Sequence, residues 1–134
     1  FYDVFPKDQE IIQRIVLYLH ANEVTTPCGN RLTVDLFLSI GLRLLGFSGS
    51  FARCHYVLER AFDLPLNQGE STLSYYFLRA IDNLLSFDTN PIYALLHEPC
   101  YSTEKLANQW SAHRILQSPK YKDTFDAVAR AKQG

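Results

Sequence analysis

The most specific chemistry in this sequence lies in residues 86–101, which read SFDTNPIYALLHEPCY. Asn90 is a suitable N-cap for a helix that begins at Pro91, because proline is well accommodated at the first helical position. Pro99 disfavours helical backbone in the residue before it, so this helix is expected to end near Glu98. A carboxylate at that end faces the negative end of the helix dipole, which is favourable only beside a cation. The segment therefore predicts that Glu98 meets a cation, either from the protein or from a ligand.

Aromatic residues surround this acidic turn in the sequence. Phe87, Tyr93 and Tyr101 flank Glu98, and a carboxylate among aromatic rings suits a small cation with an apolar body, such as the terminal amine of a peptide. The alternative is that the rings belong to the hydrophobic core and that Glu98 pairs with Arg114 or another basic residue. The residue types alone leave both interpretations open.

Two other motifs resemble catalytic signatures without meeting their requirements. Residues 46–50, GFSGS, have serine where the GxSxG nucleophile motif needs its last glycine, and the motif also needs a preceding strand. His97 and Glu98 begin an HExxH zinc pattern, but Tyr101 replaces the second histidine and Pro99 interrupts the helix. We therefore expect no catalytic residue, no metal site and no cofactor in this chain.

The remaining histidines and the cysteines show no ligand spacing. The three cysteines are an odd number without a CxxC pair, which favours free thiols in a reducing, cytoplasmic location over a disulfide framework. The other histidines are expected at the surface or at the edge of the core. These residues are Cys28, Cys54, Cys100, His20, His55 and His113.

Length and composition favour a single domain over residues 1–134. The chain is 47% hydrophobic and has a formal net charge of −1, so it can bury one core and is not expected to bind nucleic acid. No run of uncharged residues reaches the length of a membrane span, so no membrane partner is expected. The sequence contains no methionine, which leaves two interpretations open: a segment of a longer chain, or a small protein with a trimmed terminus.

Apolar residues recur at helical spacing through most of the chain, and no run alternates with period two. The predicted fold is therefore all-α, an irregular bundle of about six to seven short helices. Proline, glycine and asparagine predict loops at residues 22–31 and 63–69. The expected helices are 6–21, 33–45, 50–62 (with Ser48 as an alternative first residue), 71–86, 91–98, 102–116 and a last helix from residue 118.

Four segments resemble, in order, the cap region of the larger prolyl aminopeptidases, or proline iminopeptidases, of the α/β-hydrolase superfamily. The segment LSFDTNPIYALLHEPCY is the most specific. It is the end of the longer segment FLRAIDNLLSFDTNPIYALLHEPCY, and the other segments are YDVFPKD, NRLTVDLFLSIGLRLLGFSGSFARCHYVLERAF and NQWSAHRI.

The resemblance implies a helical cap inserted into an α/β-hydrolase core that carries a Ser-Asp-His triad. This chain would be the cap without its core, and it would be inactive alone. Its partners would be that core and a peptide with N-terminal proline. Glu98 would bind the charged imino group of the proline, with Tyr93, His97 and Tyr101 lining the site. Residues 102–104, STE, depart from the turn expected in this family, which makes Glu104 a second candidate acid.

Two further interpretations accompany this one. A stand-alone helical interaction domain would bind a partner helix or peptide through an apolar groove and would have no hydrolase core. An isolated cap could also self-associate through surfaces that its core would cover. Exposed apolar patches would indicate such surfaces.

Overall fold

The computed structural model describes residues 1–63, 71–85, 89–102 and 109–133, apart from the side chain of Leu42. The described part of the chain is mainly helical, which confirms the all-α prediction. Its helices are α1 (Asp8–Ala21), α2 (Val34–Ser39), α3 (Gly41–Leu44), α4 (Ser50–Glu59), α5 (Tyr75–Leu84), α6 (Pro91–His97), the 3-10 turn η1 (Pro99–Tyr101), α7 (Ser111–Leu116) and α8 (Ala127–Gln133).

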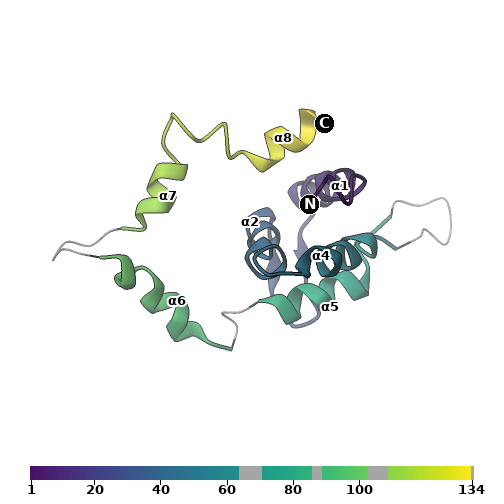
Figure 1. The fold of residues 1–134 in the computed structure, drawn as a ribbon, viewed down its shortest axis with the longest axis horizontal. Helices are drawn as coiled ribbons and strands as arrows, with labels where there is room; N and C mark the ends of the chain where they lie inside the picture. The colour runs from purple at the N-terminus through teal and green to yellow at the C-terminus, as the bar shows by residue number, and fades with distance from the viewer. Residues whose placement is uncertain (64–70, 86–88, 103–108, 134) are drawn as a thin grey trace.

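The core lies among α1 to α5, as an irregular bundle (Figure 1). The predicted stripe on α5 is buried: Phe77 is 1% exposed and Ile81 is fully buried. The predicted stripe on α1 also faces inward, with Ile15, Val16 and Leu19 buried. Helical periodicity therefore identified the buried faces of both helices, because a surface helix presents one apolar side to the core.

The predicted loop at residues 22–31 contains a short antiparallel ribbon. Strand β1 (Val24–Thr25) pairs with β2 (Arg31–Leu32), with Val24 opposite Leu32. Gly29 has φ of 89° in the connecting turn, a backbone conformation that glycine adopts without the steric cost of a Cβ. The strands are too short to show alternation, so periodicity did not reveal them.

The single helix expected over residues 33–45 is wrong. Thr33 caps α2, since its Oγ1 accepts a hydrogen bond from the backbone N–H of Leu36 at 3.2 Å. The regular helix is then interrupted at Ile40, between α2 and α3. Gly41 follows the interruption and lowers helix propensity by about 1 kcal/mol relative to alanine.

The helices expected over residues 50–62 and 71–86 are both shorter than predicted. Helix α4 ends at Glu59, and Phe62 instead forms an isolated antiparallel bridge with Leu73. Helix α5 begins after Ser74, whose Oγ accepts from the N–H of Phe77 at 3.0 Å. This cap satisfies one of the free donors of the first turn and fixes the start of the helix.

The last two expected helices are also wrong in extent. Gln109 and Trp110 both have φ of 51°, so no α-helix continues through them, and α7 starts only at Ser111. The final helix was expected from residue 118, but residues 118–125 form turns and bends. Helix α8 starts at Ala127 because Asp126 caps it: its Oδ1 accepts from the N–H of Ala129 at 2.9 Å.

Helices α6 and α7 lie to one side of the bundle, and α8 returns to α1 (Figure 1). Three half-buried residues of α8 pack against the core: Ala127, Val128 and Ala131. We call residues 89–102 and 109–117 the arm, since they have no buried residue. None of the helices that the structure describes is long and apolar enough to cross a membrane.

Candidate functional site

The arm begins with the predicted helix at residues 91–98. Asn90 takes the N-cap position of α6 and Pro91 the first helical position, although the Asn90 side chain makes no capping hydrogen bond. The helix ends at His97, and Pro99 starts η1. The α-helix therefore ends close to Glu98 as expected, but Glu98 itself keeps helical dihedral angles, with φ of −68° and ψ of −47°. The expected exclusion of helical backbone before proline is thus not observed.

Three of the predicted site residues form one row of rings along α6 and η1. The centroids of Tyr93 and His97 are 5.6 Å apart, and those of His97 and Tyr101 are 5.5 Å apart. Residues four positions apart share a helix face, which explains the row. Tyr93 is 58% and Tyr101 72% exposed, so neither of these two rings belongs to the core of the described chain.

Glu98, the acidic residue of the predicted site, is half-buried. It directly follows His97, the middle residue of this row. One of its carboxylate oxygens, Oε1, accepts a hydrogen bond from the backbone N–H of Trp110. The other oxygen accepts no hydrogen bond from the residues that the structure describes. The carboxylate therefore joins η1 to the start of α7 and keeps one oxygen for a further donor.

Two residues of the predicted site lie outside the part of the chain that the structure describes. They are Glu104, the second candidate acid, and Phe87, the aromatic residue before the helix.

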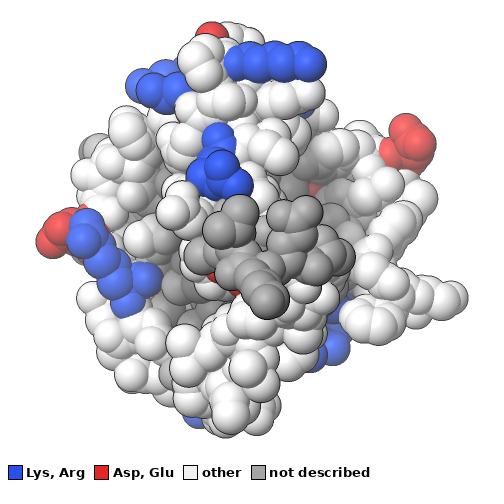
Figure 2. All heavy atoms as spheres, turned by 90° about the vertical axis from the view of Figure 1, so that its left-hand side faces the viewer, with Lys and Arg blue, Asp and Glu red and all other residues white. Residues whose placement is uncertain are grey.

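The surface of the arm is apolar and has few charges. Large side chains exposed there are Ile92, Leu95, Leu96, Trp110 and Ile115. Figure 2 shows the molecule from the side of α6 and α7, where Lys, Arg, Asp and Glu are sparse. Apolar patches of this kind commonly mark contact surfaces.

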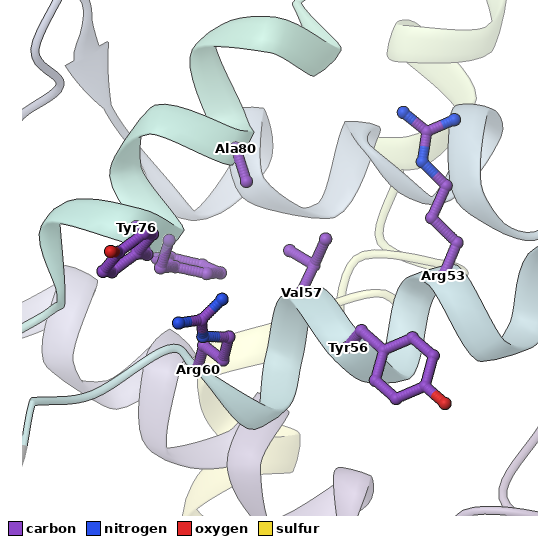
Figure 3. Close-up of a pocket in the computed structure, with 7 residues that line it drawn as sticks. Arg53, Tyr56, Val57, Arg60, Tyr76 and Ala80 are labelled. Carbon is purple, nitrogen blue, oxygen red and sulfur yellow. The ribbon is translucent and has the colours of Figure 1, made fainter.

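One cavity lies elsewhere, between α4 and α5 (Figure 3). Its volume is about 470 Å³, and its polar lining comes from Arg53, Tyr56, Arg60 and Tyr76. No residue of the predicted site lines it. The predicted site is thus a row of exposed side chains and not the lining of this cavity.

One buried polar pair was missed by sequence reasoning. Asp8 is 1% exposed, and both of its carboxylate oxygens lie 3.0 Å from Nδ1 of His55. Phe5 stacks on the His55 ring with a centroid distance of 4.2 Å. Asp8 lies in the first turn of α1, and nothing in the sequence connects it to a histidine 47 positions away.

The second missed group surrounds Asp82. Burial raises the pKa of this carboxyl, but hydrogen bonds from the Thr26 hydroxyl, the Cys28 N–H and the Asn30 side chain outweigh it, and the pKa is lowered. Thr26 Oγ1 lies 2.5 Å from Oδ1 of Asp82. The signal available in the sequence is an aspartate directly after Ile81, a residue of the apolar stripe of α5.

Neither polar group is arranged as a nucleophile or a metal site. Burial, with Asp8 nearby, raises the pKa of the Cys54 thiol to about 11, so this cysteine is not a thiolate nucleophile at neutral pH. Among the described residues, no cluster of three or more His, Cys, Asp or Glu side chains could hold a metal ion. Asp8 and Asp82 instead link segments that are distant in the sequence.

The fold and the arm define an all-α region with an exposed row of aromatic, histidine and acidic side chains. No family model matches the sequence. The chain is 39% identical over 115 residues to a proline iminopeptidase of Aeromonas sobria. That match covers 86% of this chain and 25% of the relative, so the chain spans about a quarter of the relative's length. The chain is therefore related to one region of a proline iminopeptidase.

Proposed function

We propose that this chain is the substrate-recognition cap of a serine aminopeptidase that releases N-terminal proline. The reacting groups would lie in an α/β-hydrolase core outside this chain. The sequence similarity to a proline iminopeptidase carries this proposal. A continuous match of 115 residues within a chain of 134 must include residues 20–115, so it includes the whole segment 91–101.

Glu98 is the proposed recognition residue for the substrate amine. Its Oε1 is occupied by the N–H of Trp110, which fixes the carboxylate and leaves the other oxygen for an ammonium group. The imino group of an N-terminal proline is protonated near neutral pH. A charge-assisted hydrogen bond to Glu98 would orient the first residue for attack on its carbonyl.

The exposed rings would hold the apolar part of the same residue. Tyr93, His97 and Tyr101 follow one another at ring-contact distance, and a pyrrolidine ring packs well on aromatic faces. Glu104 remains the second candidate for the acid. A cytoplasmic location is proposed from the cysteine usage in the sequence.

The proposed partner of the arm is the hydrolase core of the same enzyme. Leu95 is 73% exposed, and the neighbouring Ile92 and Leu96 are also exposed. Burying such side chains against a core would be favourable by about 1.5–3 kcal/mol for each one fully covered. The similarity to a peptidase favours this context over a stand-alone interaction domain.

The test is kinetic and uses the longer protein that contains this region. Hydrolysis of a proline-terminated fluorogenic amide should show KM at least about tenfold higher for Glu98→Gln, since a charge-assisted hydrogen bond contributes roughly 1.5–3 kcal/mol. Glutamine keeps an oxygen to accept from Trp110, so the arm should stay folded. Glu104→Gln in parallel decides between the two candidate acids.

Glu23→Gln is the matched control, because Glu23 is an exposed acid whose partner is Arg31 at 3.0 Å. Its KM should equal that of the unmodified enzyme. If neither Glu98→Gln nor Glu104→Gln changes KM, these acids do not bind the substrate amine. Hydrolysis by the 134-residue chain alone would contradict the assignment of the reacting groups to another part of the enzyme.

A further inference from the structure

The cavity between α4 and α5 has the features of a separate ligand site (Figure 3). Its volume of about 470 Å³ lies within the range of small-molecule pockets. The floor is apolar: Phe77 is buried, and Val57 and Ala80 are half-buried. A ligand that fills this space must therefore carry an apolar body.

The charged groups around the cavity are all positive. Arg53 and Arg60 line it, and the lining contains no aspartate or glutamate. Arg53 lies in α4 and Arg60 directly follows the helix. They are seven positions apart, which corresponds to about two helical turns, roughly 10 Å. Val57 lies between them in Figure 3, so a cation flanks the apolar floor on each side.

Arg60 is held in place for binding. Its guanidinium carbon lies 4.3 Å from the centroid of the Tyr76 ring, an arrangement that leaves the N–H groups at the guanidinium edge available to an acceptor. Neither Arg60 nor Arg53 donates a hydrogen bond or forms an ion pair within the described part of the chain. A planar guanidinium with free donors favours bidentate binding of a carboxylate.

We propose that this cavity binds a small organic monocarboxylate with an apolar body. The carboxylate would be bound by Arg60, and the apolar body would lie over Val57, Phe77 and Ala80. Arg53 would add favourable charge from the opposite side. This site does not depend on the proposed peptidase function, because it involves none of the residues assigned to that function.

The test is a titration of the full 134-residue chain with 4-phenylbutyrate, followed by amide-resolved NMR. Signals of α4 and α5 residues around the cavity should shift, with a dissociation constant in the millimolar range. The neutral analogue 4-phenylbutanamide has the same body without the charge, and it should bind about tenfold more weakly. Equal affinity for the two compounds, or shifts confined to other elements, would overturn the proposal.

Three variants locate the site. Arg60→Gln should weaken 4-phenylbutyrate binding about tenfold, because it removes the charge while keeping a polar side chain. Ala80→Leu should abolish binding of both compounds by filling the cavity without changing charge. Arg130→Gln is the control, since Arg130 is an exposed residue of α8, and it should leave binding unchanged. Unaltered affinity in Arg60→Gln or in Ala80→Leu would also overturn the proposal.

Discussion

The bundle of α1 to α5 and the arm contain similar types of apolar residue, but the two regions differ in whether these residues are buried. The fully buried hydrophobic residues of the described chain all lie between Ile15 and Leu84. In the arm, Leu95 and Trp110 are exposed. The bundle therefore buries an apolar core, although Phe47 and Tyr76 are exposed on its surface, whereas the described arm buries none of its apolar residues.

Helix length and burial together strengthen this contrast. Helices α6 and α7 have seven and six residues and bury none of them. The short helices of the bundle, α2 with six residues and α3 with four, contribute the buried side chains of Phe37 and Leu44. Isolated helices shorter than about 12–15 residues are marginal in water, so short helices depend on tertiary packing. The arm should consequently be the less stable region, and contact with a partner should stabilise it.

The largest expected effect separates the two regions by stability. Phe77→Ala should reduce the free energy of unfolding by about 3–5 kcal/mol, because it removes a buried ring from the core. Leu95→Ala in the arm should change it by less than about 0.5 kcal/mol. Urea unfolding monitored by circular dichroism measures both values. Comparable losses in the two variants would show that the arm contributes to the same packed core.

The next effect concerns the carboxylate that links the ribbon to α5. Asp82→Asn should cost about 1–3 kcal/mol at pH 7, since the donors on Asp82 lose their charged acceptor. The folded-state pKa of Asp82 is lowered. Its stabilisation is therefore complete above the unfolded-state pKa, about 3.9 for aspartate, and is lost as pH falls through the folded-state pKa.

Unfolding measured from pH 7 to pH 2 checks this expectation. The difference in free energy of unfolding between the original chain and Asp82→Asn should become smaller as the pH approaches 2. Asp3→Asn, a change at an exposed aspartate, should leave the pH profile unaltered. A constant difference across the whole range would contradict the contribution of ionised Asp82.

A smaller and local effect is expected where Glu98 joins η1 to α7. Glu98→Ala removes the acceptor of the Trp110 N–H, so that amide should exchange with solvent several-fold faster. Global stability should change by less than about 1 kcal/mol, because the link is in the exposed arm. Hydrogen exchange resolved by NMR measures both the exchange rate of the Trp110 amide and the global stability. An unchanged Trp110 rate would show that the carboxylate does not hold the arm together.

The smallest change in stability is expected for a double variant of α6 that should clearly reduce self-association of the chain. Replacing Leu95 and Leu96 with serine removes two exposed apolar side chains of α6, so stability should stay within about 0.5 kcal/mol. Any self-association of the isolated chain through the arm should decrease. Sedimentation velocity at several concentrations measures it. Association that persists in the double variant would place the contact on another surface.

Much of the bundle was predictable because its signals are local. The apolar residues of α5 and α1 repeat at helical spacing, and Thr33 marks the start of α2 because its hydroxyl caps the helix. The residues of the arm row, Tyr93, His97 and Tyr101, were also identified from one short segment. What that segment did not indicate is the hydrogen bond between Glu98 and the backbone of Trp110, 12 positions later.

The helix limits that failed depend on contacts or on backbone conformations outside the periodic pattern. Phe62 leaves the expected helix to pair with Leu73, and left-handed backbone at Gln109 and Trp110 delays α7. Asp126 caps α8, so this helix starts at Ala127 and not at residue 118, where its start was expected. A periodic apolar pattern indicates which face is buried more reliably than where the helix stops.

The sequence by itself determined that this chain folds as helices, which faces of α1 and α5 are buried, and which residues lie together on α6. These properties follow from residue periodicity and from proline, both of which act over a few neighbouring positions. Tertiary structure alone decided that Asp8 meets His55, that Asp82 meets the ribbon, and that Arg53 and Arg60 face a cavity with Tyr76. Such contacts join distant segments, and their positions are set by how the helices pack against one another.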